Sequence, residues 1–210
     1  MPIENVRNRG YFKIEGAARA FKFDFRNKVV LDVGSSTGGF TQYALDRGAK
    51  KVIAVEKGTN QMVEPLRHDP RVELHEKTDI FDVGIQDDLL EDRKFGRTAL
   101  SVSERKLSCT PDVILADVSF ISLTKILNHL KANFKGQNVD YLIMLKPQFE
   151  ARPDQLNKGV VKNEKIRREV IKNFEQWLKV NGFIIIKKRD NDLKGKTGNQ
   201  ERFYYLRLAK

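Results

Sequence analysis

Seven short apolar runs recur along the sequence, and they restrict the possible folds more than any other feature does. They are Val29–Val33, Val52–Val55, Val72–Leu74, Val113–Ala116, Tyr141–Leu145, Phe183–Ile186 and Phe203–Leu206. Near-continuous apolar strands that alternate with helices are typical of a mainly parallel sheet covered on both faces. A polar, glycine-containing stretch separates the last two runs and favours an antiparallel pair there. We therefore predict an α/β fold with a seven-stranded, mainly parallel sheet and an antiparallel last strand.

The helical stretches and the length of the chain complete this outline. The clearest helix is predicted over residues 164–181, where apolar side chains form one stripe and Gly182 provides a stop. Residues 82–111 are polar and charged with no sustained period, so we expect a surface insertion there. With 210 residues the chain is long enough for one domain with its own core, which we place over residues 1–210.

The net charge of +11 is concentrated at the two ends of the chain, residues 1–28 and 152–210, around a nearly neutral centre. Such a distribution favours a polyanionic partner, although cations that merely solvate a surface would give the same count. If the partner is RNA, the basic ends are expected to contact its phosphates. The candidate contacts are Arg7, Arg9, Arg19, Lys22, Lys187, Lys188, Arg189, Lys194 and Lys196.

Several classes of protein are disfavoured by composition. No stretch reaches the length of a membrane span, and the N-terminus lacks the apolar core of a secretory signal. Cys109 is the only cysteine, so no internal disulfide can form, and the three histidines have no metal-ligand spacing with it. We expect a cytoplasmic protein without a metal.

A glycine-rich segment follows the first apolar run and opens a helix that ends near Gly48. In a strand–turn–helix unit of this kind, backbone N–H groups and the positive end of the helix dipole face a bound ligand. A nucleotide-like cofactor is therefore expected here. Its candidate contacts are Asp32, Gly34, Ser35, Ser36, Thr37, Gly38, Gly39 and Phe40.

The residues of this turn distinguish among the classes of protein that use similar glycine-rich turns. A phosphate loop requires a lysine where Phe40 stands, and the dinucleotide fingerprint requires a second glycine where Ser36 stands. The G-x-S-x-G elbow of serine hydrolases does match from Gly34 to Gly38, which makes a hydrolase the sharpest competing class. No histidine follows Asp140, however, and the elbow would lie on the first strand, so a hydrolase is disfavoured.

Two acidic residues are candidates for the rest of such a ligand. Glu56 ends the second apolar run, 22 positions after Gly34, a spacing that suits an acid binding the hydroxyls of a ribose. Asp79 follows the third run, where it could face an adenine amine or be an ordinary loop residue.

Five strings, in order along nearly the whole chain, resemble the TlyA or haemolysin A family of FtsJ-like ribosomal RNA 2′-O-methyltransferases. They are DVGSSTGGFT (32–41), RGAKKVIAVEKGTNQ (47–61), DVSFIS (117–122), LKPQFE (145–150) and GNQE (198–201). The resemblance implies a Rossmann-like methyltransferase fold, S-adenosylmethionine as the methyl donor, and ribosomal RNA or ribosomal subunits as partners. It also implies a catalytic Lys-Asp-Lys-Glu tetrad, which corresponds here to Lys13, Asp117, Lys146 and Glu201, with Asp117 also facing the cofactor.

The sequence departs from the family in three places. Asn8 stands where a serine usually precedes the arginine, and the insertion at residues 82–111 is longer than usual. Most members also carry a small RNA-binding domain ahead of these motifs, and this sequence has no counterpart of it. A protein that holds the cofactor and RNA without catalysis is the alternative function, which the intact tetrad disfavours. A pore-forming haemolysin is disfavoured because no stretch is suited to a membrane.

The tetrad agrees with the chemistry that a sugar alcohol requires. A ribose hydroxyl is a poor nucleophile, so a base must accept its proton as the new bond forms. Lys146 ends an apolar run and precedes Pro147, which places it at the carboxyl edge of the sheet. A lysine with an ordinary pKa of about 10.4 is neutral at pH 7 only at a cost of about 4 kcal/mol. Lys13 and burial favour the neutral amine, whereas Asp117 and Glu201 favour the charged form. These two carboxylates are therefore expected to orient the ammonium groups and the hydroxyl.

Overall fold

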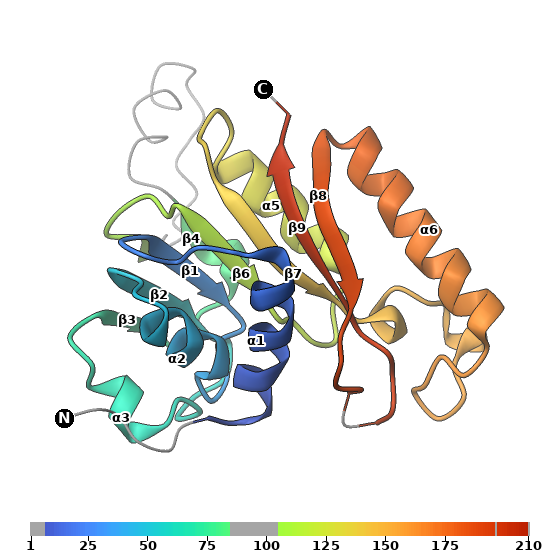
Figure 1. The fold of residues 1–210 in the computed structure, drawn as a ribbon, viewed down its shortest axis with the longest axis horizontal. Helices are drawn as coiled ribbons and strands as arrows, with labels where there is room; N and C mark the ends of the chain where they lie inside the picture. The colour runs from blue at the N-terminus through green and yellow to red at the C-terminus, as the bar shows by residue number, and fades with distance from the viewer. Residues whose placement is uncertain (1–6, 85–104, 196, 210) are drawn as a thin grey trace.

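The computed structural model describes residues 7–84, 105–195 and 197–209, and a seven-stranded sheet runs through its centre (Figure 1). Its strand order is β3-β2-β1-β6-β7-β9-β8. The strands are β1 (Val29–Val33), β2 (Lys51–Val55), β3 (Val72–His75), β6 (Val113–Ala116), β7 (Asp140–Leu145), β8 (Phe183–Asp190) and β9 (Arg202–Leu208). Only β9 is antiparallel to its neighbours β7 and β8. The predicted mainly parallel sheet with an antiparallel last strand is confirmed.

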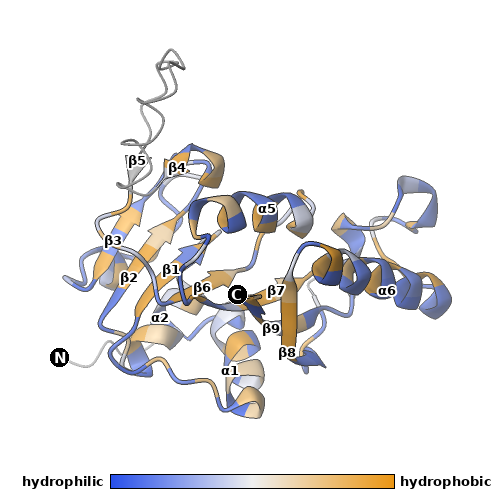
Figure 2. Cartoon of the chain, turned by 90° about the horizontal axis from the view of Figure 1, so that it is seen from above, coloured by the Kyte–Doolittle hydropathy of each residue, from blue (hydrophilic) through white to orange (hydrophobic). Residues whose placement is uncertain are grey.

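Helices cover both faces of this sheet (Figure 2). One face packs against α1 (Arg9–Phe21), α2 (Gly39–Asp46) and α3 (Glu64–Arg67), whereas the other packs against α5 (Leu123–Asn133) and α6 (Glu164–Val180). Successive strand residues alternate between the two cores, so that Val30 belongs to the first and Leu31 to the second. Because both faces are buried, the strands carry the continuous apolar runs that identified them.

The basic N-terminal segment contains a helix that the sequence analysis did not anticipate. Asn8 caps α1 by accepting a hydrogen bond from the backbone N–H of Tyr11, and five apolar residues bury one side of it. They are Tyr11, Ile14, Ala17, Ala18 and Phe21. A Cβ atom on Gly39 would collide with Asn8 Oδ1. The glycine thus lets the N-termini of α1 and α2 approach each other directly.

Two other segments differ in extent from the prediction. At the ends of the predicted insertion, β4 (Val83–Gly84) pairs with β5 (Arg105–Lys106), and Val83 and Leu107 are buried in the core. The prediction of a surface insertion over 82–111 is therefore wrong at its ends, while residues 85–104 lie outside the described part. Strand β8 runs four residues beyond the apolar run and includes Lys187, Lys188 and Arg189. These polar residues extend the strand because they lie at an edge of the sheet, where apolar side chains are not required.

Candidate active site

The glycine-rich turn lies where β1 leaves the sheet and meets α2. Gly34 (φ +79°), Ser36 (φ +48°) and Gly38 (φ +89°) have left-handed backbone conformations, which favour glycine at two of these positions. A Cβ on Gly34 would lie 3.1 Å from the backbone oxygen of Asp117, so this glycine also permits the close approach of the loop after β6. The turn and that loop together form one wall of a cavity.

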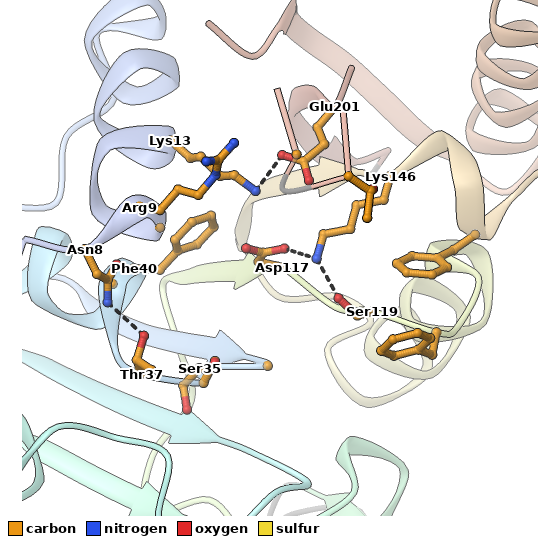
Figure 3. Close-up of a pocket in the computed structure, with 18 of the residues that line it drawn as sticks. Asn8, Arg9, Lys13, Ser35, Thr37, Phe40, Asp117, Ser119, Lys146 and Glu201 are labelled. Atoms are coloured by element: carbon orange, nitrogen blue, oxygen red, sulfur yellow. Dashed lines mark hydrogen bonds and ion pairs between the residues drawn. The ribbon is translucent and has the colours of Figure 1, made fainter. Parts of the chain in front are cut away.

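This cavity has a volume of about 730 Å³ and brings together all four predicted tetrad residues (Figure 3). Lys13 comes from α1, Asp117 from the carboxyl end of β6, Lys146 from the carboxyl end of β7 and Glu201 from the residue before β9. Because β9 is antiparallel, its first residues lie at the same edge of the sheet as the last residues of β7, where Leu145 pairs with Arg202. Four segments that are distant in sequence therefore meet at one point.

Inside the cavity the tetrad forms two ion pairs. Lys146 Nζ lies 2.6 Å from Asp117 Oδ1 and donates a hydrogen bond of 2.7 Å to Ser119 Oγ. Lys13 Nζ lies 2.6 Å from Glu201 Oε2, and the side chains of this second pair are only 9% and 3% exposed. The Asn191 side chain also donates to Glu201 Oε2 at 3.4 Å. Each lysine thus has its own carboxylate, and the Lys13 pair is the more deeply buried.

A second cavity of about 590 Å³ adjoins the first and shares Gly34, Asp117 and Ser119 with it. Most of its wall is apolar and is formed by Val33, Val55, Ile80, Val118, Ile121 and Ile126. Besides Asp117, it contains the carboxylates of Glu56 and Asp79. The Glu56 carboxylate accepts hydrogen bonds from the backbone N–H groups of Ser36 (2.9 Å) and Gly58 (2.6 Å). These bonds fix its orientation and leave lone pairs for further donors.

Asp79 has two roles within the protein in addition to lining the second cavity. It caps the short helix η1 (Ile80–Asp82) by accepting from the backbone N–H of Phe81, and it pairs with Lys57 at 2.9 Å. Burial raises the pKa of Asp79, but these hydrogen bonds outweigh burial and leave the pKa below its usual value. The ordinary loop role that the sequence allowed is therefore present, whether or not a ligand uses this residue.

Two of the predicted cofactor contacts lie behind the turn and do not line either cavity. Gly38 faces Leu66, and Asp32 is fully buried, where its Oδ2 accepts a hydrogen bond of 2.7 Å from Thr41 Oγ1. Burial raises the pKa of Asp32 to about 7, and the nearby Asp117 carboxylate adds to this effect. Ser35, Ser36, Thr37, Gly39 and Phe40 do line the first cavity, together with Gly34.

Replacement of Asp32 by asparagine is expected to raise the melting temperature by about 5 °C at pH 8 and to change it little near pH 4. The folded protein holds the Asp32 proton up to about pH 7, whereas an unfolded aspartate releases it near pH 4. Wild-type stability should therefore fall as the pH rises through this window, and the neutral amide avoids that loss. Thermal unfolding from pH 4 to pH 8 tests this. A melting-temperature difference that does not vary with pH would contradict it.

The structure adds residues to the site that the sequence analysis did not single out. Phe120 is 92% exposed in a left-handed conformation (φ +63°), and its ring centroid lies 5.2 Å from that of Phe149. Both rings and Ser119 line the first cavity. All three residues belong to the strings DVSFIS and LKPQFE, so the strings marked the right loops, but only the structure shows these side chains at the cavity.

The predicted RNA contacts fall into different environments. Arg9 lines the first cavity and Lys194 is exposed on the loop beside it, where Arg9 donates to the Lys194 carbonyl. Arg7 lies over the ring of Tyr11. Arg19 and Lys22 lie at the other end of α1, about 15 and 20 Å from Arg9 along the helix axis. Lys196 lies outside the described residues.

The remaining three predicted contacts hold helices against β8. Lys187 Nζ donates to the Phe21 carbonyl at 2.6 Å, Lys188 pairs with Glu175 of α6 at 2.7 Å, and Arg189 donates to the Gly16 carbonyl at 3.1 Å. Their charged groups are therefore already engaged with α1 and α6. Lys158, which the sequence analysis did not select, is exposed beside Gly159, a residue that lines the first cavity.

Two further searches concern metals and membranes. Within residues 7–84, 105–195 and 197–209, no three His, Cys, Asp or Glu residues are grouped so that they could hold a metal ion. None of the helices in the described part of the chain combines the length and apolarity needed to span a bilayer.

Comparisons with known proteins show which family the chain belongs to. Hemolysin A of Brachyspira hyodysenteriae is 34% identical over 204 residues, which make up 95% of this chain and 76% of that protein. The 16S/23S rRNA (cytidine-2′-O)-methyltransferase TlyA of Mycobacterium tuberculosis is 32% identical over 201 residues, or 95% of this chain and 68% of that protein. A crystal structure from Lactococcus lactis, of a protein provisionally named a hemolysin, superimposes with a TM-score of 0.82 at 32% identity, covering 97% of this chain and 89% of that one.

The fold is shared more widely than the sequence. A protein from Listeria monocytogenes, provisionally named an S-adenosylmethionine-dependent methyltransferase, has a TM-score of 0.64 at 17% identity and covers 96% of this chain. The model of the FtsJ-like methyltransferases matches residues 6–208, which is nearly the whole sequence and includes both cavities. From this match and the relatives above 30% identity, the chain belongs to the FtsJ-like methyltransferase family.

Proposed function

We propose that this chain transfers a methyl group from S-adenosylmethionine to a ribose 2′-hydroxyl of ribosomal RNA. The observation that carries the proposal is the junction of two cavities at Asp117, with Lys146 held at that junction by Asp117 and Ser119. One cavity suits a nucleoside, and the other is open, basic at its rim and lined by the tetrad. The names of the relatives from Mycobacterium tuberculosis and Campylobacter jejuni, both rRNA (cytidine-2′-O)-methyltransferases, support the choice of substrate.

The second cavity and the turn fit S-adenosylmethionine, which supplies an electrophilic methyl group on its sulfonium. The apolar wall suits an adenine ring, and Glu56 is oriented to accept hydrogen bonds from ribose hydroxyls. Ser35 Oγ, buried at the first cavity, has no hydrogen-bond partner within the described protein and suits a polar group of the ligand. The rest of the wall that would face the cofactor is formed by Gly34, Ser36, Thr37, Gly39 and Phe40.

In the proposed reaction Lys146 acts as the base. S-adenosylmethionine would supply the methyl group and be left as a neutral thioether when its carbon–sulfur bond breaks, while the proton of the ribose hydroxyl would pass to the lone pair of a neutral Lys146 Nζ, which becomes an ammonium. Asp117 and Ser119 hold this nitrogen in place, and Asp117 stabilises the ammonium that forms. The buried Lys13–Glu201 pair places a further cation beside the oxygen as negative charge develops on it.

Two aromatic rings at the first cavity favour a nucleic acid over a small alcohol as the substrate. Phe120, which is exposed, and Phe149, which is half-buried, both line the first cavity, and an unstacked base can stack on aromatic rings of this kind. Arg9, Lys158 and Lys194 add positive charge at the same mouth, where phosphates would pass. A ribosomal RNA substrate also places the reaction in the cytoplasm.

The proposed function is tested by incubating the chain with labelled S-adenosylmethionine and purified ribosomal subunits, followed by nucleoside analysis. We expect label in a 2′-O-methylated nucleoside of one subunit. Methylation of a base would contradict the assignment of the acceptor. Binding of cofactor and subunits without any transfer would instead favour the non-catalytic alternative.

The double variant Lys158→Glu/Lys194→Glu is expected to weaken RNA binding by about tenfold or more and to flatten its salt dependence. Both residues are exposed beside the tetrad cavity, so their reversal removes phosphate contacts at the proposed site. The matched control is Arg19→Glu/Lys22→Glu, which changes the net charge equally at the far end of α1. Binding to a ribosomal RNA fragment at several salt concentrations measures the effect. Equal losses in the two variants would indicate a general charge effect instead of a site at the cavity.

A further inference from the structure

We infer that Glu150 is a positioning residue that joins the two loops carrying Asp117 and Lys146, an inference that rests on the proposed function of those two residues. Glu150 lines neither of the two cavities that form the site and so would act on the reaction only through other residues. It ends the string LKPQFE, and it has no part in the tetrad.

The contacts of Glu150 are directed entirely at the loop that follows β6. One carboxylate oxygen accepts a hydrogen bond of 2.6 Å from Ser122 Oγ, and the other accepts one of 2.6 Å from the backbone N–H of Leu123. Leu123 is the first residue of α5, whose N-terminal N–H groups have no partners within the helix. A carboxylate at this end of a helix also interacts favourably with the helix dipole. Glu150 thus fastens the end of the 117–122 loop to the end of the 146–150 loop.

Two other bridges join the same loops, and both belong to the site. Lys146 contacts Asp117 and Ser119 at one end, and the Phe149 ring contacts the Phe120 ring in the middle. The Lys146 bridge holds the nitrogen that is proposed to accept the proton. The Glu150 bridge is partly buried as well, and this burial raises the pKa of Glu150 above its usual value despite the hydrogen bonds from Ser122 and Leu123.

The loop needs such an anchor because of the conformation of Phe120. A left-handed φ of +63° is unfavourable for an aromatic residue and persists only where the surroundings impose it. The Phe120 side chain is 92% exposed, so its own burial cannot impose that conformation. Ser122 and Leu123, two and three residues later, are the points at which the Glu150 side chain holds the far end of this loop. Without them the loop is free to relax, and Asp117, Ser119 and Phe120 would move relative to Lys146.

The test compares Glu150→Ala with Glu150→Gln. Glutamine can keep both contacts: its amide oxygen accepts from Leu123, and its amide nitrogen donates to Ser122 Oγ, whose own proton then goes to Thr124 Oγ1 at 2.7 Å. Alanine removes both contacts. The control is Glu169→Ala. Glu169 is an exposed residue of α6, and together with Glu150 it lines a further, smaller cavity away from the site.

We expect Glu150→Ala to lower kcat by about 10- to 100-fold with KM for S-adenosylmethionine changed less than about threefold. Glu150→Gln and Glu169→Ala should each retain kcat within about threefold of wild type. A merely structural role would lower the amount of folded enzyme and not the turnover of the folded fraction. Wild-type kcat per folded molecule in Glu150→Ala would therefore overturn the inference, as would a Glu150→Gln variant as impaired as Glu150→Ala.

A readout without turnover separates this inference from the proposed function. Hydrogen–deuterium exchange of the chain alone should be faster over residues 118–123 in Glu150→Ala and unchanged in Glu150→Gln. Exchange that is equal in Glu150→Ala and wild type would overturn the bridge even if methyl transfer is confirmed. A wild-type chain that transfers no methyl group would refute the proposed function, while the exchange would still decide whether Glu150 holds the loop.

Discussion

Replacement of Lys146 by methionine is expected to lower kcat for methyl transfer by about a thousandfold or more, with the affinity for S-adenosylmethionine changed less than about threefold. Methionine keeps most of the side-chain volume and removes the nitrogen that contacts Asp117 and Ser119. The acceptor hydroxyl would then have no base within reach. Single-turnover transfer of label to ribosomal subunits measures the chemical step, and calorimetry measures cofactor binding.

The control for this variant is Lys125→Met, which removes an exposed lysine of α5. It should leave both measurements at the wild-type level. Turnover of Lys146→Met within about fivefold of wild type would exclude Lys146 as the base, because general bases contribute at least about a hundredfold. Lys13 would then be the remaining amine in the cavity for that role.

Removing one member of the buried Lys13–Glu201 pair is expected to have the largest effect on stability. In Lys13→Met the Glu201 carboxylate, 3% exposed, loses a cation at 2.6 Å and keeps only the longer contact from Asn191. An uncompensated buried charge costs about 3–5 kcal/mol, which for a chain of this size lowers the melting temperature by roughly 10 °C. Thermal and urea unfolding measure this loss.

A second substitution separates the contribution of this pair to protein stability from its proposed role in catalysis. In Lys13→Met/Glu201→Leu neither charge remains, and apolar side chains of similar volume fill the space, so most of the lost stability should return. Methyl transfer should stay impaired, because the double variant lacks the cation beside the acceptor oxygen. If activity returned together with stability, the pair would have only a structural role.

The sheet was predictable because its strands are buried on both faces. The bounds of β1 and β6 coincide with the apolar runs, since each strand lies between two others and between two helical layers. Strand β8 was predicted four residues too short, because an edge strand tolerates Lys187, Lys188 and Arg189 where an inner strand would not. The hydropathy of the sequence therefore indicates which residues are buried, and it predicts the bounds of a strand only where the whole strand is buried.

Helix α1 shows a different limit of the sequence analysis. Five apolar residues of this helix have the spacing of an amphipathic helix: Tyr11, Ile14, Ala17, Ala18 and Phe21. The basic residues among them were interpreted as RNA contacts instead. Two of the five are alanines, which contribute little to an apolar pattern. The helix matters for the proposed function because it carries Lys13 to the cavity.

The candidate site was predictable residue by residue only through the family strings. The glycine-rich turn and the strand ends indicated a nucleotide-like ligand. The pairing of Lys13 with Glu201 could not be predicted in this way, because it depends on how α1 packs against the segment before β9, and no local sequence pattern encodes that packing. Lys187 and Arg189 illustrate the reverse case. Their charge suggested a partner molecule, and the structure shows them donating to backbone carbonyls of α1.

The position of β9 has a consequence for how the protein is made. This strand follows all the other described strands in the chain, yet it lies inside the sheet, between β7 and β8. During synthesis on the ribosome, the edge of β7 that faces away from β6 therefore stays unpaired until residues 202–208 emerge. Strand β8 cannot join the sheet before then. Glu201 directly precedes this strand, so the proposed tetrad is incomplete in a nascent chain until translation has passed it.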